Sequence, residues 1–224
     1  MEDNIGVAEE TAPPASTSRV RDPERTKQDI LRVAAEEFAK HGLSGARVDA
    51  IAARTHTTKR MIYYYFESKE GLYVAVLERA YSGIRQIESN MNLGELDPET
   101  ALRRLVEFNF DYHEAHPEFV RLVMIENIHN AEHVRGSEIL RRTNSPAIEI
   151  LSDILARGYK TGAFKRQIEA KELHMLISAL SFYRVSNRAT FGTLFSLDIG
   201  SAPARERQRR HIADSILLLM TTPV

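Results

Sequence analysis

The sequence contains no cysteine among its 224 residues, so disulfide bonds, thiol catalysis and cysteine-ligated metal sites are excluded. It also lacks any apolar run long enough to span a membrane. Residues 1–18 are acidic and contain no apolar stretch, which argues against a signal peptide. We therefore expect a cytoplasmic protein without a membrane partner, and no motif in the sequence indicates a cofactor.

A large excess of either charge is also absent, because the formal net charge is -1 at pH 7. An evenly spread charge of this size would argue against binding to nucleic acid. The charges are unevenly distributed, however. Residues 1–18 hold four acidic side chains and no basic one, whereas residues 19–70 hold 11 basic and eight acidic side chains. The modest basic excess therefore lies in the first third of the chain.

Helical periodicity dominates what the sequence does contain. There is no run of alternating strand pattern and no internal repeat, so we expect an all-α fold of about nine helices. The expected breaks are Gly42, residues 90–98, His116-Pro117, Gly136, Ser145-Pro146, Thr161-Gly162 and residues 190–203. The apolar pattern predicts helices over residues 24–40, 48–54, 58–66, 68–88, 99–115, 118–128, 146–159, 171–187 and 205–220.

Two short predicted helices, 48–54 and 58–66, lie on either side of a three-residue turn, which is the arrangement of a helix-turn-helix. At 100° per residue, Lys59, Arg60, Tyr63 and Tyr64 fall on one half of the second helix. Met61, Ile62, Tyr65 and Phe66 fall on the opposite half. A basic and aromatic face suits a DNA major groove, because cationic donors meet guanine acceptors and tyrosine reaches phosphate or a thymine methyl.

At these residues the sequence resembles the TetR (tetracycline-repressor) family of bacterial transcription regulators. The family pattern is present as Ile51-Ala52, the run Tyr63–Phe66 and Ser68-Lys69-Glu70, and the specific match extends from about Arg25 to Tyr73. The rest of the chain agrees only in length and in its helical character. The resemblance implies a homodimer that binds double-stranded operator DNA and responds to a small-molecule effector.

The resemblance also assigns roles to individual residues. It makes residues 58–66 the recognition helix, Thr58 its cap and a phosphate contact, Lys69 a phosphate contact, and Arg47 a contact to the DNA backbone. One position departs from the family, because His56 stands where the turn usually has Gly. A left-handed His costs roughly 1 kcal/mol relative to Gly. The predicted DNA-binding residues are Arg47, Thr58, Lys59, Arg60, Tyr63, Tyr64 and Lys69.

We divide the chain into a disordered tail (1–22), a helix-turn-helix DNA-binding domain (23–69) and a helical ligand-binding and dimerisation domain (70–224). The last two helices are the best dimerisation candidates because both carry apolar stripes. These stripes are Leu173, Leu176, Ile177 and Leu180 on one helix, and Ile212, Ile216, Leu217, Leu219 and Met220 on the other. The predicted lining of a pocket for an apolar or aromatic effector is Phe108, Asn109, Tyr112, Met124, Asn127, Phe182 and Tyr183.

The sequence therefore predicts a ligand-responsive transcription regulator, a repressor released from a palindromic operator by a small organic ligand. Two alternatives remain open. A helical enzyme is one, although no nucleophile elbow, phosphate loop or paired-carboxylate motif supports it, so we expect no catalytic residues. A metal-responsive regulator that uses His113, His116, His129 and His133 is the other, but no thiolate supports such a site and plain surface or core histidines are the favoured interpretation.

Overall fold

The protein is described here by a computed structural model that covers residues 22–223, and this range contains helices and no strand. The predicted all-α class is therefore correct. Most of the predicted tail, residues 1–21, lies outside the described residues. The elements are α1 (Pro23–Gly45), α2 (Val48–Arg54), α3 (Lys59–Phe66), α4 (Lys69–Ser89), η1 (Leu93–Glu95), α5 (Pro98–Ala115), α6 (Pro117–Ile128), α7 (Glu132–Gly136), α8 (Glu138–Thr161), α9 (Ala170–Ser186), α10 (Arg188–Leu194) and α11 (Ala202–Thr221).

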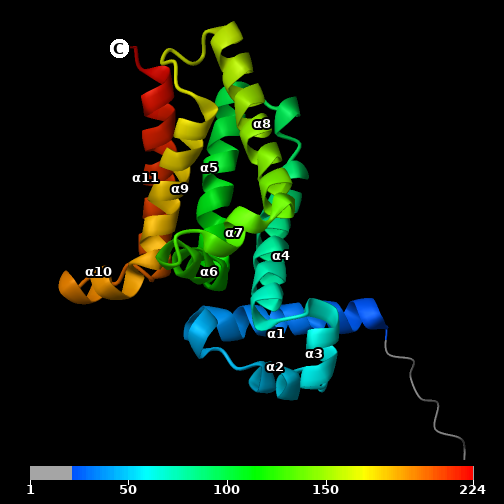
Figure 1. Cartoon of the computed structure of the whole chain (residues 1–224). Coiled ribbons are helices and arrows are strands. Elements are labelled where there is room, and N and C mark those ends of the chain that lie inside the picture. Colours follow the sequence, from blue (N-terminus) through cyan, green and yellow to red (C-terminus); the bar gives the residue numbers. More distant parts are fainter. Residues whose placement is uncertain (1–21, 224) are drawn as a thin grey trace, which may run out of the picture.

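Helices α1 to α3 form a small unit at one end of the molecule (Figure 1). Asp22 caps α1 by accepting the backbone N–H of Glu24 at 3.0 Å. The helical conformation of α1 is interrupted at Gly42, whose φ of 69° favours glycine, so the predicted break there is confirmed. The three helices bury a shared apolar core that includes Phe38, Ile51 and Ile62.

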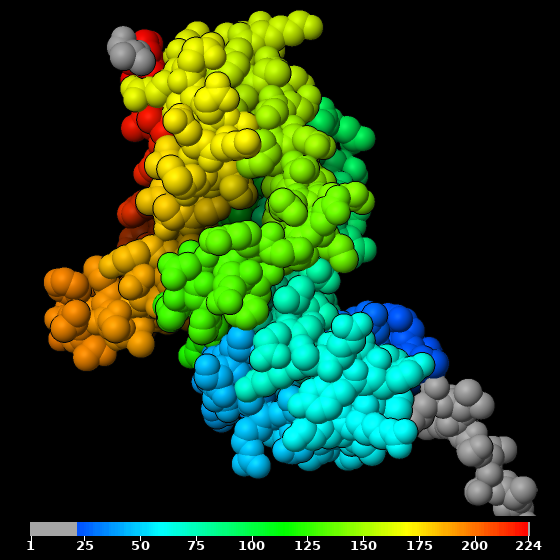
Figure 2. Space-filling view, viewed as in Figure 1, coloured from blue at the N-terminus to red at the C-terminus, as the bar shows by residue number. Residues whose placement is uncertain are grey.

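The remaining helices form a larger bundle joined to this unit by α4. Helix α5 packs against α8, α9 and α11, and α4 packs against both α1 and α8. The bundle core is built mainly from leucine and isoleucine side chains of α5, α8, α9 and α11, with Phe164 and Met220. Figure 1 shows α4 running out of the small unit into the bundle, and Figure 2 shows α10, in orange, projecting from the body of the molecule. None of the helices in the described range is long and apolar enough to cross a membrane.

The structure corrects the helix count and one helix start. Two short helices, α7 and α10, add to the nine predicted ones, and α8 begins at Glu138 instead of Pro146. Pro146 was expected to break the chain, because proline removes a backbone donor and crowds the preceding turn. Leu140, Ala147 and Leu151 are all buried on one side of α8, and this packing keeps the helix continuous through the proline.

Gly158 on α8 lies at a tightly packed place in the bundle. A Cβ at this position would lie 2.0 Å from the ring of the buried Phe164. We therefore expect Gly158→Ala to lower the free energy of unfolding by about 1–3 kcal/mol through overpacking, measured by urea denaturation. Gly83→Ala is the matched control, because its Cβ would meet only the Tyr112 hydroxyl at an ordinary 3.6 Å. Equal effects of the two substitutions would contradict the predicted clash.

Candidate nucleic-acid interface

The turn between α2 and α3 is fixed by backbone hydrogen bonds. The N–H of Thr57 donates to the carbonyl of Ala52 at 3.1 Å, and the N–H of Thr55 donates to Ile51 at 3.1 Å. His56 has a φ of 48°, so it holds the left-handed turn position that usually favours glycine. The residue at this position therefore differs from the family pattern, but the left-handed backbone conformation of the turn is kept.

The N-terminus of α3 has a side-chain cap, whereas that of α2 has none. Thr58 accepts the N–H of Met61 at 3.2 Å and so caps α3, as predicted. Arg47 precedes α2, and its backbone N–H donates to Oε1 of Glu37 at 3.1 Å. Glu37 is buried on α1, so it ties the start of α2 to the first helix. Sequence reasoning missed Glu37, because only the tertiary packing brings it to residue 47.

Helix α3 is amphipathic in the predicted sense. Ile62 and Phe66 are buried, whereas Lys59, Arg60, Tyr63 and Tyr64 are exposed, and Tyr64 has 76% of its surface accessible. Met61 was predicted on the apolar half, but it is 37% exposed, and only Ile62 and Phe66 of that half are buried. The accessible face of α3 is therefore basic and aromatic.

Two lysines that were predicted to contact DNA interact with neighbouring groups of the protein. The ammonium group of Lys59 lies 3.3 Å from a carboxylate oxygen of Asp49 on α2, and both side chains are about half exposed. Lys69 donates to the carbonyl of Ser44 at 3.1 Å. Both interactions are solvent-accessible, so they position the lysines without removing their charge from the surface.

The junction of α3 and α4 is a tight turn. Glu67 has a φ of 64° and a ψ of -52°, and the N–H of Ser68 donates to the carbonyl of Phe66 at 2.7 Å. Ser68 then caps α4 by accepting the N–H of Gly71 at 2.9 Å. Because Phe66 is buried in the core beside this turn, the orientation of α3 is coupled to the start of α4.

Three of the residues predicted to line an effector pocket meet in one aromatic cluster between α4, α5, α6 and α9. Phe108 and Phe182 pack against the core that contains Tyr112, and the rings of Phe108 and Tyr112 lie 5.8 Å apart. His113 lies at the same place, with its ring 5.7 Å from Phe182 and stacked 5.9 Å from Phe119. The structure therefore brings these side chains together from distant parts of the sequence.

The other four predicted lining residues are placed differently. Asn109 is buried, and its side chain donates to the carbonyl of Leu105 one turn earlier at 3.0 Å. Asn127 is exposed, and its side chain likewise bonds to its own helix. Met124 of α6 is 37% exposed and Tyr183 of α9 is 54% exposed. The sequence pattern placed these residues on helices correctly, but it did not show which side of each helix faces the interior.

A buried polar group that sequence reasoning missed lies next to Asn109. Arg85 and Glu88 form an ion pair on α4, and both are almost fully buried. Arg85 also donates from Nε to Oδ1 of Asn144 on α8 at 3.2 Å. Burial raises the pKa of Glu88, and the neighbouring Arg85 opposes this change. The sequence gives only a weak signal for this pair, an Arg and a Glu three residues apart on a helix.

The four histidines of the metal hypothesis do not share one site. His113 bonds to Ser181 at 3.0 Å, His116 lies 3.1 Å from Glu118, and His133 lies 3.1 Å from Glu126. His129 and His133 approach each other with ring centroids 5.8 Å apart. Within residues 22–223, no three or more histidine, aspartate or glutamate side chains are grouped so that they could hold a metal ion.

The predicted dimerisation stripes divide between the interior and the surface. Leu173, Ile177, Ile216 and Met220 are buried in the core of the chain itself. Leu176 and Leu180 remain exposed on α9, and Ile212, Leu217 and Leu219 are only partly buried on α11. The first group therefore stabilises the bundle, and only the second group is accessible to a partner.

Comparison with known proteins agrees with this arrangement. A family model described as "Bacterial regulatory proteins, tetR family" matches residues 30–76, and a "Tetracyclin repressor-like, C-terminal domain" model matches residues 98–216. The chain belongs to the TetR family. It is therefore a DNA-binding transcriptional regulator, and α2 and α3 are its helix-turn-helix.

Individual relatives of this TetR-family protein extend over most of its length. The transcriptional repressor NicS of Pseudomonas putida is 36% identical over 199 residues, which are 89% of this chain and 94% of NicS. The repressor SCO4008 of Streptomyces coelicolor is 34% identical over 74% of this chain and 81% of its own. The solved structure of the putative regulator SCO4942 from the same organism has a TM-score of 0.65 at 26% identity, and covers 88% of this chain and 99% of its own.

The left-handed conformation of His56 leads to a stability prediction. We expect His56→Gly to leave the free energy of unfolding unchanged or to raise it by up to about 1 kcal/mol, because relief of strain exceeds the entropy that glycine adds to the unfolded chain. Ala53→Gly in α2 is the control and should lose about 1 kcal/mol. Denaturation curves measure both. A loss of more than about 1 kcal/mol for His56→Gly would show that the imidazole makes a stabilising contact.

His113 leads to a pH prediction, because burial lowers its pKa from 6.5 to about 4. The unfolded chain takes up a proton near pH 6.5 that the folded chain does not take up, so stability falls as the pH drops from 6.5 towards 4. The loss from this residue is on the order of 3 kcal/mol. His113→Gln should flatten this dependence in urea titrations at pH 7 and pH 5, whereas His41→Gln, at an exposed position, should not. If the free energy of unfolding of His113→Gln falls between pH 7 and pH 5 as much as that of the wild-type protein, His113 is not the source of the pH dependence.

Proposed function

We propose that this regulator is a repressor that binds a palindromic operator as a homodimer and is released by a small organic effector. The exposed basic and aromatic face of α3 carries the proposal, because its side chains suit major-groove readout. The names of NicS and SCO4008 favour repression, whereas FasR of Mycolicibacterium smegmatis, 31% identical over 57% of this chain, is named an activator.

The homodimer is proposed from exposed apolar side chains of the last three helices and of the segment after α10. Several large side chains of α9, α10 and α11 and of the segment after α10 face solvent in the single chain, an arrangement typical of an interaction surface. A second copy would bury them and give two recognition helices related by a twofold axis. These side chains are Met175, Leu176, Leu180, Leu194, Phe195, Leu197 and Leu218.

We place the effector beside the aromatic cluster of Phe108, Tyr112 and Phe182. The buried Ile84 of α4, which directly precedes Arg85 of the buried ion pair, belongs to the same cluster. An apolar or aromatic organic molecule suits such surroundings. Met124 and Asn127 face outwards and are not part of this proposal.

The packing between the two parts of the chain supports a route from effector to DNA. Helix α1 packs against α6 and α4, and Leu122 of α6 and Leu140 of α8 belong to the same core as Phe38 of α1. A ligand that favours a different position of α4 or α6 would therefore move the helix-turn-helix unit. Release follows if this state spaces the two recognition helices wrongly for successive major grooves.

Substitutions on and beside α3 test the DNA-binding surface. After the operator is selected from a random library, Arg60→Ala or Lys59→Ala should lose about 1–3 kcal/mol on the operator and little on random DNA, if either contacts a base. Lys69→Ala should weaken both DNAs and reduce the salt slope by about one per half-site, because a phosphate contact carries no sequence information.

The affinity of each variant for operator and for random DNA is measured by titration at several salt concentrations. Arg142→Ala on α8 is the control, since Arg142 is exposed and ion-paired only with Glu138 of its own helix. If Lys69→Ala changes base preference while the α3 variants lose affinity uniformly, the assignment of the reading face is wrong. If the wild-type protein shows no sequence preference as a dimer, the operator proposal itself fails.

A further inference from the structure

A hollow lies where α9, α10 and α11 meet. Its volume is about 290 Å³, near the lower end of the range for small-molecule sites. Apolar and aromatic side chains form much of its wall, including Leu180, Tyr183, Phe191 and Ile212. The rings of Tyr183 and Phe191 lie 6.2 Å apart at 82° to each other.

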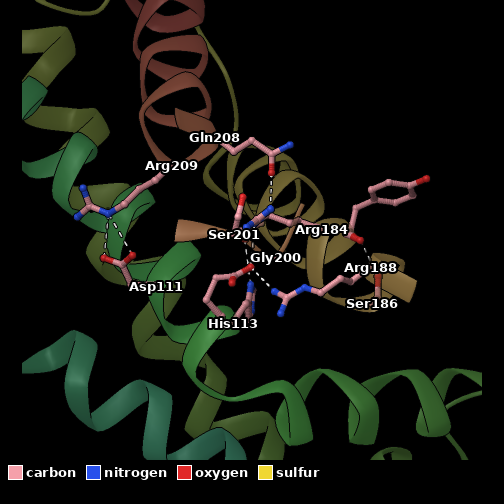
Figure 3. Close-up of polar contacts among 12 residues, drawn as sticks. Asp111, His113, Arg184, Ser186, Arg188, Gly200, Ser201, Gln208 and Arg209 are labelled. Carbon is pink, nitrogen blue, oxygen red and sulfur yellow. Dashed lines mark hydrogen bonds and ion pairs between the residues drawn. The ribbon is translucent and has the colours of Figure 1, made fainter. Parts of the chain in front are cut away.

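One charged side chain also lines this hollow. Arg184 of α9 is only 5% exposed, and Figure 3 shows it directed towards Gln208 of α11. Its Nη1 donates to Oε1 of Gln208 at 2.6 Å, and its guanidinium lies 5.4 Å from the ring centre of Phe110. Nη2 is buried and has no hydrogen-bond partner within the described residues. An unpaired buried donor of this kind costs free energy unless an acceptor reaches it.

The charges around Arg184 do not balance. Glu114 of α5 is its nearest carboxylate, with Oε1 2.9 Å from Nε of Arg184, but the same oxygen lies 2.6 Å from Nη2 of Arg188. Two buried or half-buried arginines therefore share one carboxylate. The hollow thus has a local excess of positive charge that favours an anion.

We propose that this hollow binds a small organic acid, whose carboxylate accepts from Nη2 of Arg184 and whose apolar or aromatic body packs against Tyr183 and Phe191. A planar guanidinium suits a carboxylate in geometry as well as charge. The proposal does not depend on the operator or on the effector position beside α5, because binding is measured on the free protein. It predicts an anion site at the face where α9 and α11 are expected to meet a second copy.

Benzoate is a suitable probe, and benzamide is its neutral counterpart of similar shape. We expect benzoate in the millimolar range to raise the melting temperature of the full-length protein and to give a saturable calorimetric signal, and benzamide to do neither. Arg184→Gln should abolish the benzoate effect. Arg209→Gln is the matched control, because Arg209 of α11 pairs with Asp111 and Glu107 and does not line the hollow.

A second variant keeps the test valid if Arg184→Gln fails to fold. Ile199→Trp fills the hollow from the segment before α11 and leaves Arg184 in place, so it should also abolish the benzoate effect. Equal binding of benzamide would overturn the proposal, as would a benzoate effect that survives Ile199→Trp or an effect that chloride reproduces. Absence of benzoate binding to the wild-type protein would overturn it too, and would indicate that water or a second copy occupies the hollow.

Discussion

The packing of α4 against α1 is the constraint on which the rest of the structure depends. Tyr73 of α4 is completely buried, with its ring 5.2 Å from Phe38 of α1 and 5.2 Å from His133 of α7. Leu72, Val76 and Leu77 continue the same core. Helix α4 therefore completes the core of the helix-turn-helix unit with its first two turns and contributes to the bundle with the remainder. Because one rigid helix serves both cores, the DNA-binding unit cannot change its position independently of α4.

Polar contacts hold the other side of this junction. Glu126 at the end of α6 is buried and accepts the backbone N–H groups of His133 and Val134 at 2.8 and 2.9 Å. These bonds satisfy donors at the start of α7, where no side chain of α7 itself provides a cap. A short helix of five residues is thereby fixed beside Tyr73. The combination of an apolar contact and a buried carboxylate gives the junction a defined geometry instead of a loose hinge.

Much of the DNA-binding surface could be predicted from the sequence because it depends on local chemistry. The cap at Thr58, the cap at Ser68 and the burial of Ile62 all follow from residue type and helical spacing within a few positions. Met61 shows the limit of this reasoning, since periodicity gives the direction of a side chain but not how much room the core offers. His56 shows that a turn can keep its geometry when its usual glycine is replaced.

The sequence by itself determined the helical class, the helix-turn-helix and the basic and aromatic face of α3, because these features arise from interactions between residues close along the chain. Only the tertiary structure decided which faces of the middle helices meet the interior. It alone brought Arg85 to Asn144, and Arg184 to Glu114 and Gln208, across 24 to 70 positions of the chain. A buried charge has no local signature, because its stability depends on partners that folding supplies from other helices.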